Sequence, residues 1–141
     1  MRIASETDIL RAGEHARRLA ARLDFPPSDV TVIAAAILEV ARNVVTHGGR
    51  GDLQLQLIRK RGRLGVSIVA RDRGPGIADV DQALRDGMST SGGLGLGLPT
   101  ARRLMDEFTL RSAPGRGTTI AMRKWARRRA EARARVRRAT R

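Results

Sequence analysis

The chain has 141 residues, of which 41% are hydrophobic, and its formal net charge is +14. A chain of this length suits one domain with a single core. Cysteine is absent, which excludes disulfides, a cysteine nucleophile and a cysteine metal ligand. No apolar run has the length expected of a membrane span, and the N-terminus lacks a signal-peptide pattern, so we expect a cytoplasmic protein.

The positive charge is concentrated at the C-terminus, where residues 123–141 contain ten basic residues and one acidic residue. We expect a folded domain over residues 1–125 and an arginine-rich tail over residues 126–141. Such a tail can bind nucleic acid or an acidic partner, or it can be a solvated extension. No aromatic residue follows Trp125, which favours the solvated extension.

The first half of the chain predicts a short strand and two helices. Residues 1–3 suit the strand, and apolar residues recur at helical spacing over Thr7–Leu23. The sequence "DFPP" ends that helix. Ser28 is the expected N-cap of a second, apolar helix, which reaches about His47 and ends at the two glycines that follow.

The second half predicts two pairs of strands around an irregular segment. Asp52–Arg59 alternates polar and apolar residues, "KRGR" suits a turn, and Leu64–Asp72 is a more apolar strand. Short helices over Val80–Arg85 and Leu98–Met105 precede a terminal hairpin that turns at "PGRG". The predicted fold is an α+β two-layer sandwich, in which a mixed, mostly antiparallel sheet is covered on one face by helices.

A polar stripe runs along the second predicted helix. Glu39, Asn43 and His47 are spaced four residues apart and therefore share one helix face. One interpretation is a solvated face with an i,i+4 pair. The other is a functional face, because an asparagine oxygen can take one position around Mg²⁺ and a carboxylate one turn away can accept a proton from a hydroxyl.

The second motif, "ARDRGPGI", ends the apolar strand. Asp, Gly and Pro all form turns readily, so an ordinary strand-ending turn is one interpretation. In the other, Asp72 accepts a hydrogen bond from an exocyclic amino group, and Gly74 and Gly76 let the backbone lie close to a flat ring.

The third motif is the glycine-rich stretch "STSGGLGLGLP". It lacks the Gly-Lys-Ser/Thr of a Walker loop, the preceding strand of a dinucleotide fingerprint and the Val-Ala-Ile-Lys partner of a protein-kinase loop. What remains is a loop before a helix N-terminus, where free N–H groups favour phosphate. No Lys or Arg lies between Asp86 and Ala101, so phosphate there would be met by backbone N–H groups, hydroxyls and Mg²⁺.

In this order, the motifs resemble those of the GHKL ATPase and kinase superfamily with its Bergerat ATP-binding fold. "LEVARN" is similar to the N-box, "DRGPGI" and "GGLGLGL" to the two glycine boxes, and "GTT" to the closing segment, over about residues 1–125. The segments "DGMSTSGGLGLGLP", "RRLMDEF" and "GRGT" and the final Trp125 resemble the RsbT-type serine/threonine switch kinases of bacterial partner-switching systems.

The resemblance implies a role for each motif. Glu39 would be the general base, Asn43 the Mg²⁺ ligand, and Asp72 the acceptor for the adenine amino group of ATP. The first glycine box and the closing strand would line the adenine pocket, and the second glycine box would cover the phosphates. The pocket residues would be Gly74, Gly76, Ile77 and Thr118, and the lid residues would be Ser91, Gly92, Gly93, Leu94, Gly95, Leu96 and Gly97.

The resemblance also implies a function. A kinase of this type uses Mg-ATP to phosphorylate a small STAS-domain antagonist protein, and thereby regulates a PP2C-type phosphatase or a sigma factor. A histidine-kinase catalytic domain would need a phosphoacceptor helix hairpin, for which the residues before the second helix are too few. A non-catalytic, ATP-dependent binding switch is the alternative from a different class, and the presence of both Glu39 and Asn43 counts against it.

Overall fold

The computed structural model describes residues 1–23, 25–85 and 97–126. Every helix and strand predicted from the sequence is present within these residues, although several bounds differ. The elements in chain order are β1 (Arg2–Ile3), α1 (Glu6–Arg22), α2 (Pro27–Asn43), the π-helical turn η1 (Val44–Gly48), β2 (Gly51–Lys60), β3 (Arg63–Asp72), α3 (Val80–Ala83), α4 (Leu98–Leu104), β4 (Glu107–Ser112) and β5 (Thr118–Trp125).

The five strands form one sheet in the order β1-β2-β3-β5-β4, and each neighbouring pair is antiparallel. The α+β prediction is therefore confirmed, and the sheet of the described residues is antiparallel throughout rather than mixed. The last strand in the chain, β5, lies between β3 and β4. This position brings the start of β5 next to the end of β3, where the second sequence motif lies.

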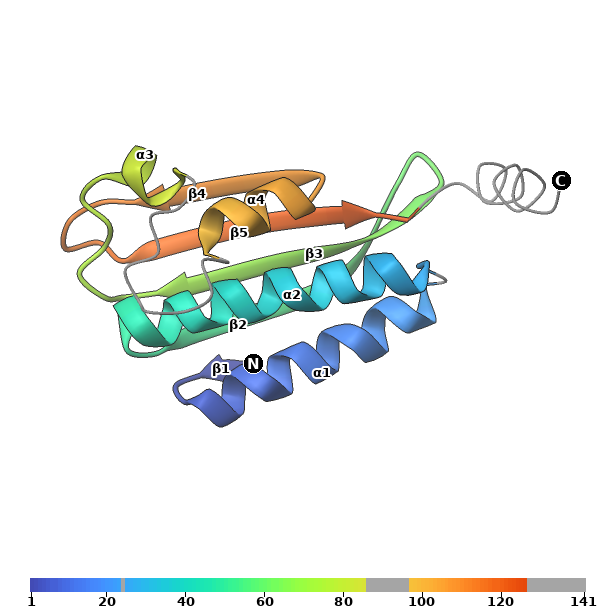
Figure 1. Ribbon diagram of the computed structural model, residues 1–141, viewed down its shortest axis with the longest axis horizontal. Helices are drawn as coiled ribbons and strands as arrows, with labels where there is room; N and C mark the ends of the chain where they lie inside the picture. The colour runs from blue at the N-terminus through green and yellow to red at the C-terminus, as the bar shows by residue number, and fades with distance from the viewer. Residues whose placement is uncertain (24, 86–96, 127–141) are drawn as a thin grey trace, which may run out of the picture.

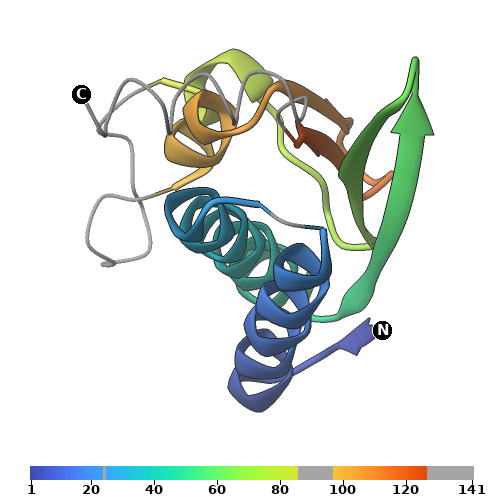
Figure 2. The same ribbon diagram turned by 90° about the vertical axis from the view of Figure 1, so that its right-hand side faces the viewer.

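The helices α1, α2 and α4 cover one face of the sheet (Figure 1). In the view along the molecule, the strands form one layer beside the helices, and among the described residues no helix lies on their other face (Figure 2). The side chains of β3 alternate accordingly: Val66, Ile68 and Ala70, at every second position, are buried on the face that the helices cover. The molecule is a two-layer sandwich, as the sequence predicts.

The core lies between the sheet and α2. Ile33, Ile37 and Val40 of α2 are completely buried, and burial of each such side chain contributes about 1.5–3 kcal/mol. The segment Pro27–Gly48 is, by length and composition, apolar enough to cross a membrane, which we did not expect from the sequence. Its apolar side chains instead contribute to the hydrophobic core of this fold.

Both ends of α2 differ from the prediction. Ser28 is not the N-cap: the helix begins at Pro27, after Pro26, and no side chain caps it. Proline suits the first helical position because its φ is already helical and that position has no intrahelical partner for an N–H. The helix also changes character before its end, since regular α geometry stops at Asn43 and η1 continues to Gly48.

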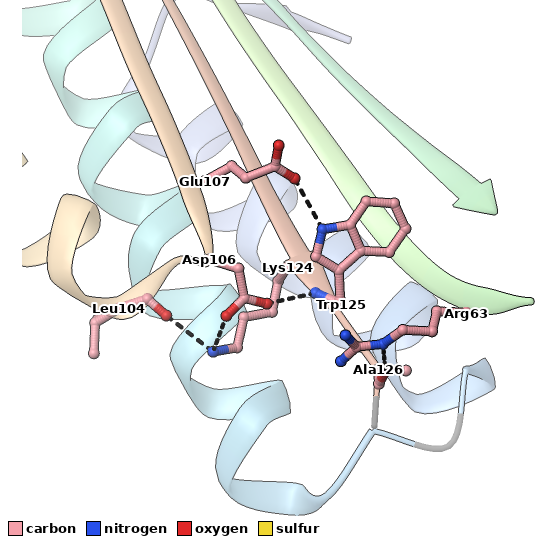
Figure 3. A network of polar contacts seen from close by, with 7 residues as sticks. All are labelled: Arg63, Leu104, Asp106, Glu107, Lys124, Trp125 and Ala126. Carbon is pink, nitrogen blue, oxygen red and sulfur yellow. Dashed lines mark hydrogen bonds and ion pairs between the residues drawn. The ribbon is translucent and has the colours of Figure 1, made fainter. Parts of the chain in front are cut away.

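A network of polar contacts holds the C-terminal end of α4 against β5 (Figure 3). Lys124 Nζ donates a hydrogen bond to the carbonyl of Leu104 (3.1 Å) and lies 3.7 Å from Asp106 Oδ1. Asp106 Oδ2 accepts a hydrogen bond from the Trp125 backbone N–H (2.7 Å). The Trp125 indole N–H donates to Glu107 Oε2 (2.8 Å). The helix that follows the glycine-rich stretch is thus fixed at its far end.

Candidate functional site

A row of polar side chains crosses one end of the sheet on its helix-covered face. Asp72 at the end of β3 is directly opposite Thr118 on β5, which is opposite Ser112 on β4. Asp72 and Thr118 are only 8% and 4% exposed. The adjacent inward-facing row, two residues away, is entirely apolar: Ala70, Ile120 and Leu110. A polar row, in which Asp72 and Thr118 are buried and Ser112 is part-buried, therefore marks the end of the hydrophobic core.

Two glycines let η1 and the loop after β3 pack closely around Asp72. Asp72 Oδ1 accepts a hydrogen bond from the Gly74 backbone N–H (2.9 Å). A Cβ on Gly48 would lie 2.4 Å from the Asp72 Cβ, and one on Gly74 would lie 2.6 Å from the Gly48 Cα. Neither position has room for a side chain without movement of its neighbours. Both glycines therefore have a packing role, while the contact of Gly74 with a flat ring stays a prediction.

Gly76 is needed for backbone reasons as well. Its φ is +80°, and a Cβ there would lie 2.1 Å from the carbonyl oxygen of Ala113. This left-handed conformation is readily available only to glycine. The close approach joins the loop after β3 to the turn between β4 and β5, and it leads directly into Ile77.

Ser112 is a residue that the sequence analysis did not identify. Its Oγ accepts a hydrogen bond from the Ile77 backbone N–H (2.6 Å), donates one to the Gly117 carbonyl (3.0 Å), and lies 2.8 Å from Thr118 Oγ1. It therefore connects the first glycine box with the closing strand. The only sequence signal for Ser112 is its alternation with Phe108 and Leu110 on the inward face of β4, which gives no indication of partners 35 residues away.

The second group of candidate residues lies on α2. Asn43 is 9% exposed, and its Nδ2 is buried with no hydrogen-bond partner in the described part of the chain. The Glu39 side chain, one turn earlier, is 17% exposed. The interpretation of this stripe as a solvated face is therefore wrong for Asn43, while Glu39 is part-buried. His47 is exposed. The i→i+5 turn of η1 is wider than an α-helical turn, so residues after Asn43 no longer follow the 3.6-residue period that would place His47 on the same face as Glu39 and Asn43.

Burial and a nearby arginine act in opposite directions on Glu39. Burial raises the pKa of its carboxyl, and the positive charge of Arg42 partly offsets this increase. Arg42 Nη1 lies 4.0 Å from Glu39 Oε1, and its Nη2 lies 3.6 Å from Glu6 Oε1 on α1. A carboxylate with a raised pKa is a stronger base than a solvated one. Arg42 is part of the motif "LEVARN", but the motif by itself predicts no role for it.

The fold brings the two groups to the same end of the molecule. Asn43 directly precedes η1, and η1 packs against Asp72 through Gly48. Of the predicted lid, only Gly97 is described; it is the N-cap of α4, which packs against α2. The remaining lid residues lie outside the described residues: Ser91, Gly92, Gly93, Leu94, Gly95 and Leu96.

These residues fit a nucleotide with Mg²⁺. The unpartnered atom of Asn43 is Nδ2, a buried donor, which is destabilising without an acceptor and therefore suits a ligand oxygen such as that of a phosphate. Within the described ranges, no group of three or more His, Asp or Glu residues could hold a metal ion. A cation that takes most of its oxygen ligands from phosphates and water needs only one side chain from the protein, and Asn43 can supply it through its other amide atom, the oxygen Oδ1.

Comparison with known proteins defines the class. Residues 4–124 match the histidine kinase-like ATPase domain family, and the chain belongs to this family. The solved structure of the mycobacterial sensor histidine kinase MprB superposes with a TM-score of 0.52 at 20% identity, over 86% of this chain and 94% of that one. This similarity shows the shared fold.

Relatives within the family are more specific. Over 127 residues the chain is 46% identical to the serine/threonine-protein kinase RsbT of Bacillus subtilis. The matched region covers 90% of this chain and 96% of that protein. It is 27% identical over 112 residues to the anti-sigma F factor of a Thermoanaerobacter species, over 75% of this chain and 77% of that protein. These matches confirm the predicted GHKL membership and, at the level of the family, the predicted class of serine/threonine kinase.

Proposed function

We propose that the protein is a Mg-ATP-dependent serine/threonine protein kinase of a bacterial partner-switching pathway. The observation that carries the proposal is the face of α2, where a buried amide without a partner, Asn43, lies one turn from a part-buried carboxylate, Glu39. Buried polar groups without a partner are rare in native structures, and a ligand is one explanation for the one on Asn43. The 46% identity to RsbT over most of both chains supports the same activity.

In this proposal, ATP binds between α2 and the polar end of the sheet. The adenine amino group donates a hydrogen bond to Asp72, beside Thr118, and Gly74, Gly76 and Ile77 border the base. Asn43 would hold Mg²⁺, which neutralises phosphate charge and orients the γ-phosphoryl group when bound. The glycine-rich segment that ends at Gly97 would cover the phosphates with its backbone N–H groups.

Glu39 would act on the acceptor hydroxyl. As the oxygen of a Ser or Thr on the partner protein bonds to the γ-phosphorus, the bond from that phosphorus to the ADP oxygen breaks, and the hydroxyl proton passes to Glu39. The raised pKa of Glu39 suits this role, because it makes the carboxylate a better proton acceptor. Most of the remaining catalytic effect in phosphoryl transfer comes from positioning and charge neutralisation.

The expected substrate is a STAS-domain antagonist protein, and the expected regulatory target is a PP2C-type phosphatase or a sigma factor. Similarity to both RsbT and anti-sigma F factors supports this assignment to partner switching. We further propose that residues 1–125 form the kinase domain, that residues 126–141 have no catalytic role, and that the protein acts in the cytoplasm.

Phosphotransfer to a STAS-domain protein from the same genome tests the proposal. We expect the wild type to form phosphoserine or phosphothreonine on that protein in the presence of Mg-ATP, measured by mass spectrometry. Glu39→Gln should slow transfer by about 10²–10⁴-fold with ATP affinity retained. Glu14→Gln, at an exposed position of α1, is the matched control and should leave transfer unchanged.

Two results would contradict the proposal. Transfer at the wild-type rate by Glu39→Gln would remove Glu39 from catalysis. ATP binding without any transfer by the wild type, together with release of a partner on nucleotide exchange, would instead favour the non-catalytic switch.

A further inference from the structure

The Ser112 hydroxyl has three partners but only one proton. The Ile77 backbone N–H can only donate, and the Gly117 carbonyl can only accept. Ser112 therefore receives the bond from Ile77 and gives its proton to Gly117. The contact of 2.8 Å with Thr118 Oγ1 can then be a hydrogen bond only if Thr118 donates. All three bonds form together in this arrangement and in no other.

This arrangement determines what Thr118 can offer to a ligand. A threonine hydroxyl has one proton, so a Thr118 that donates to Ser112 presents only its lone pairs elsewhere. Asp72 is directly opposite Thr118 on the neighbouring strand, on the same helix-covered face of the sheet. An ionised carboxylate also accepts hydrogen bonds only. The two buried side chains thus form a pair of acceptors at adjacent positions.

We propose that Ser112 is a specificity-determining residue of the nucleotide site, a proposal that rests on the function proposed above. By holding the Thr118 proton, it keeps this part of the pocket an acceptor surface. A 6-amino purine places a donor against that surface. A 6-keto purine places an oxygen and its lone pairs there, which leaves buried acceptors without partners. Ser112 is a positioning residue, since it acts through Thr118 and need not touch the base.

ATP and ITP separate this role from simple structural support, because they differ only in the amino or keto group at C6 and the proton at N1. We expect the wild type to bind ATP more tightly than ITP, with Kd measured by calorimetry in the presence of Mg²⁺. In Ser112→Ala, the Thr118 hydroxyl is free to turn and donate to the keto oxygen. The ratio of the ITP Kd to the ATP Kd should therefore fall about tenfold.

Two further variants complete the test. Ser112→Thr keeps the hydroxyl and suits a strand, so it should retain the wild-type ratio. Thr109→Ala lies on the exposed outer face of β4 and should also retain it. If Ser112→Ala proves too unstable to measure, Thr118→Val keeps the β-branched shape, removes the hydroxyl, and should lower the ratio as well.

A Ser112→Ala or Thr118→Val variant that weakens ATP and ITP by the same factor would overturn the proposal, since that result describes a structural role only. A wild type that binds ATP but does not discriminate against ITP would overturn it too. Failure of the wild type to bind ATP at all would be a different result, because it would remove the proposed function itself.

Discussion

Because the Asn43 amide is buried without a partner, we predict that Asn43 lowers the stability of the nucleotide-free protein and serves to bind a ligand. Its Nδ2 has no hydrogen-bond partner within the described residues, and a buried donor without a partner costs about 1–3 kcal/mol. Asn43→Leu keeps the branching at Cγ and removes both polar atoms. Leucine also has a higher helix propensity by a few tenths of a kcal/mol. We expect the free energy of unfolding without nucleotide to rise by about 1–2 kcal/mol.

Urea unfolding without nucleotide measures this change, with circular dichroism and the fluorescence of Trp125, the only tryptophan, as signals. Gln56→Leu, at an exposed position of β2, is the control for a general effect of leucine and should stay within about 0.5 kcal/mol of wild type. A Mg-ATP analogue at one hundred times its Kd should then stabilise the wild type by about 2.7 kcal/mol. At the same analogue concentration, Asn43→Leu should gain less than the wild type, and its gain should not depend on Mg²⁺.

Two outcomes would refute this reasoning. If Asn43→Leu is less stable than wild type without nucleotide, the amide is satisfied in the folded protein and has a structural role. If the analogue stabilises the variant as much as the wild type, Asn43 is not part of the nucleotide site.

Two other substitutions test the packing and the electrostatics of the site. Gly74→Ala should weaken nucleotide binding and destabilise the protein more than Gly115→Ala does. A Cβ on Gly74 would lie 2.6 Å from the backbone of Gly48, whereas Gly115, despite its φ of +75°, has open space around it. Equal losses of stability in urea unfolding would contradict this prediction. Burial raises the pKa of Glu39, so phosphotransfer should rise with pH through that raised value as the carboxylate forms. Arg42→Gln removes the charge that lowers the pKa of Glu39, so it should move the rise in phosphotransfer to higher pH. The control Arg59→Gln should leave the pH–rate profile unchanged. A profile that does not shift in Arg42→Gln would remove Arg42 from this role.

The fold was predictable because each element follows from a local pattern. Asp52–Arg59 alternates with the period of a strand, and the Ala-, Ile- and Val-rich segment before His47 has the composition of a core helix. The terminal hairpin follows from the turn at Pro114–Gly117, where Gly115 and Gly117 both have positive φ. The start of α2 was missed because Ser28 is a good N-cap by residue type, while Pro27 fits the first helical position better.

Part of the site depends on contacts that no local pattern contains. The motifs single out Glu39, Asn43 and Asp72 as candidates, because their residue types and spacing match a known chemistry. Ser112 was not among the candidates, because its proposed role depends on a bond to Ile77 and on the pairing of β4 with β5. Arg42 was missed for a similar reason, since its effect depends on how deeply the adjacent Glu39 is buried and on its contact with α1.

The central claim is that Asp72 and Asn43 belong to one Mg-ATP site. Binding of an ATP analogue, with and without Mg²⁺, to the wild type, Asp72→Asn and Asn43→Ala tests it most directly. Asp72→Asn retains an oxygen for the Gly74 N–H but presents a donor to the adenine. We predict that it abolishes binding, and that Asn43→Ala binds the analogue without the Mg²⁺ dependence of the wild type. A wild type that binds no nucleotide, or an Asp72→Asn variant that binds it normally, would contradict the account.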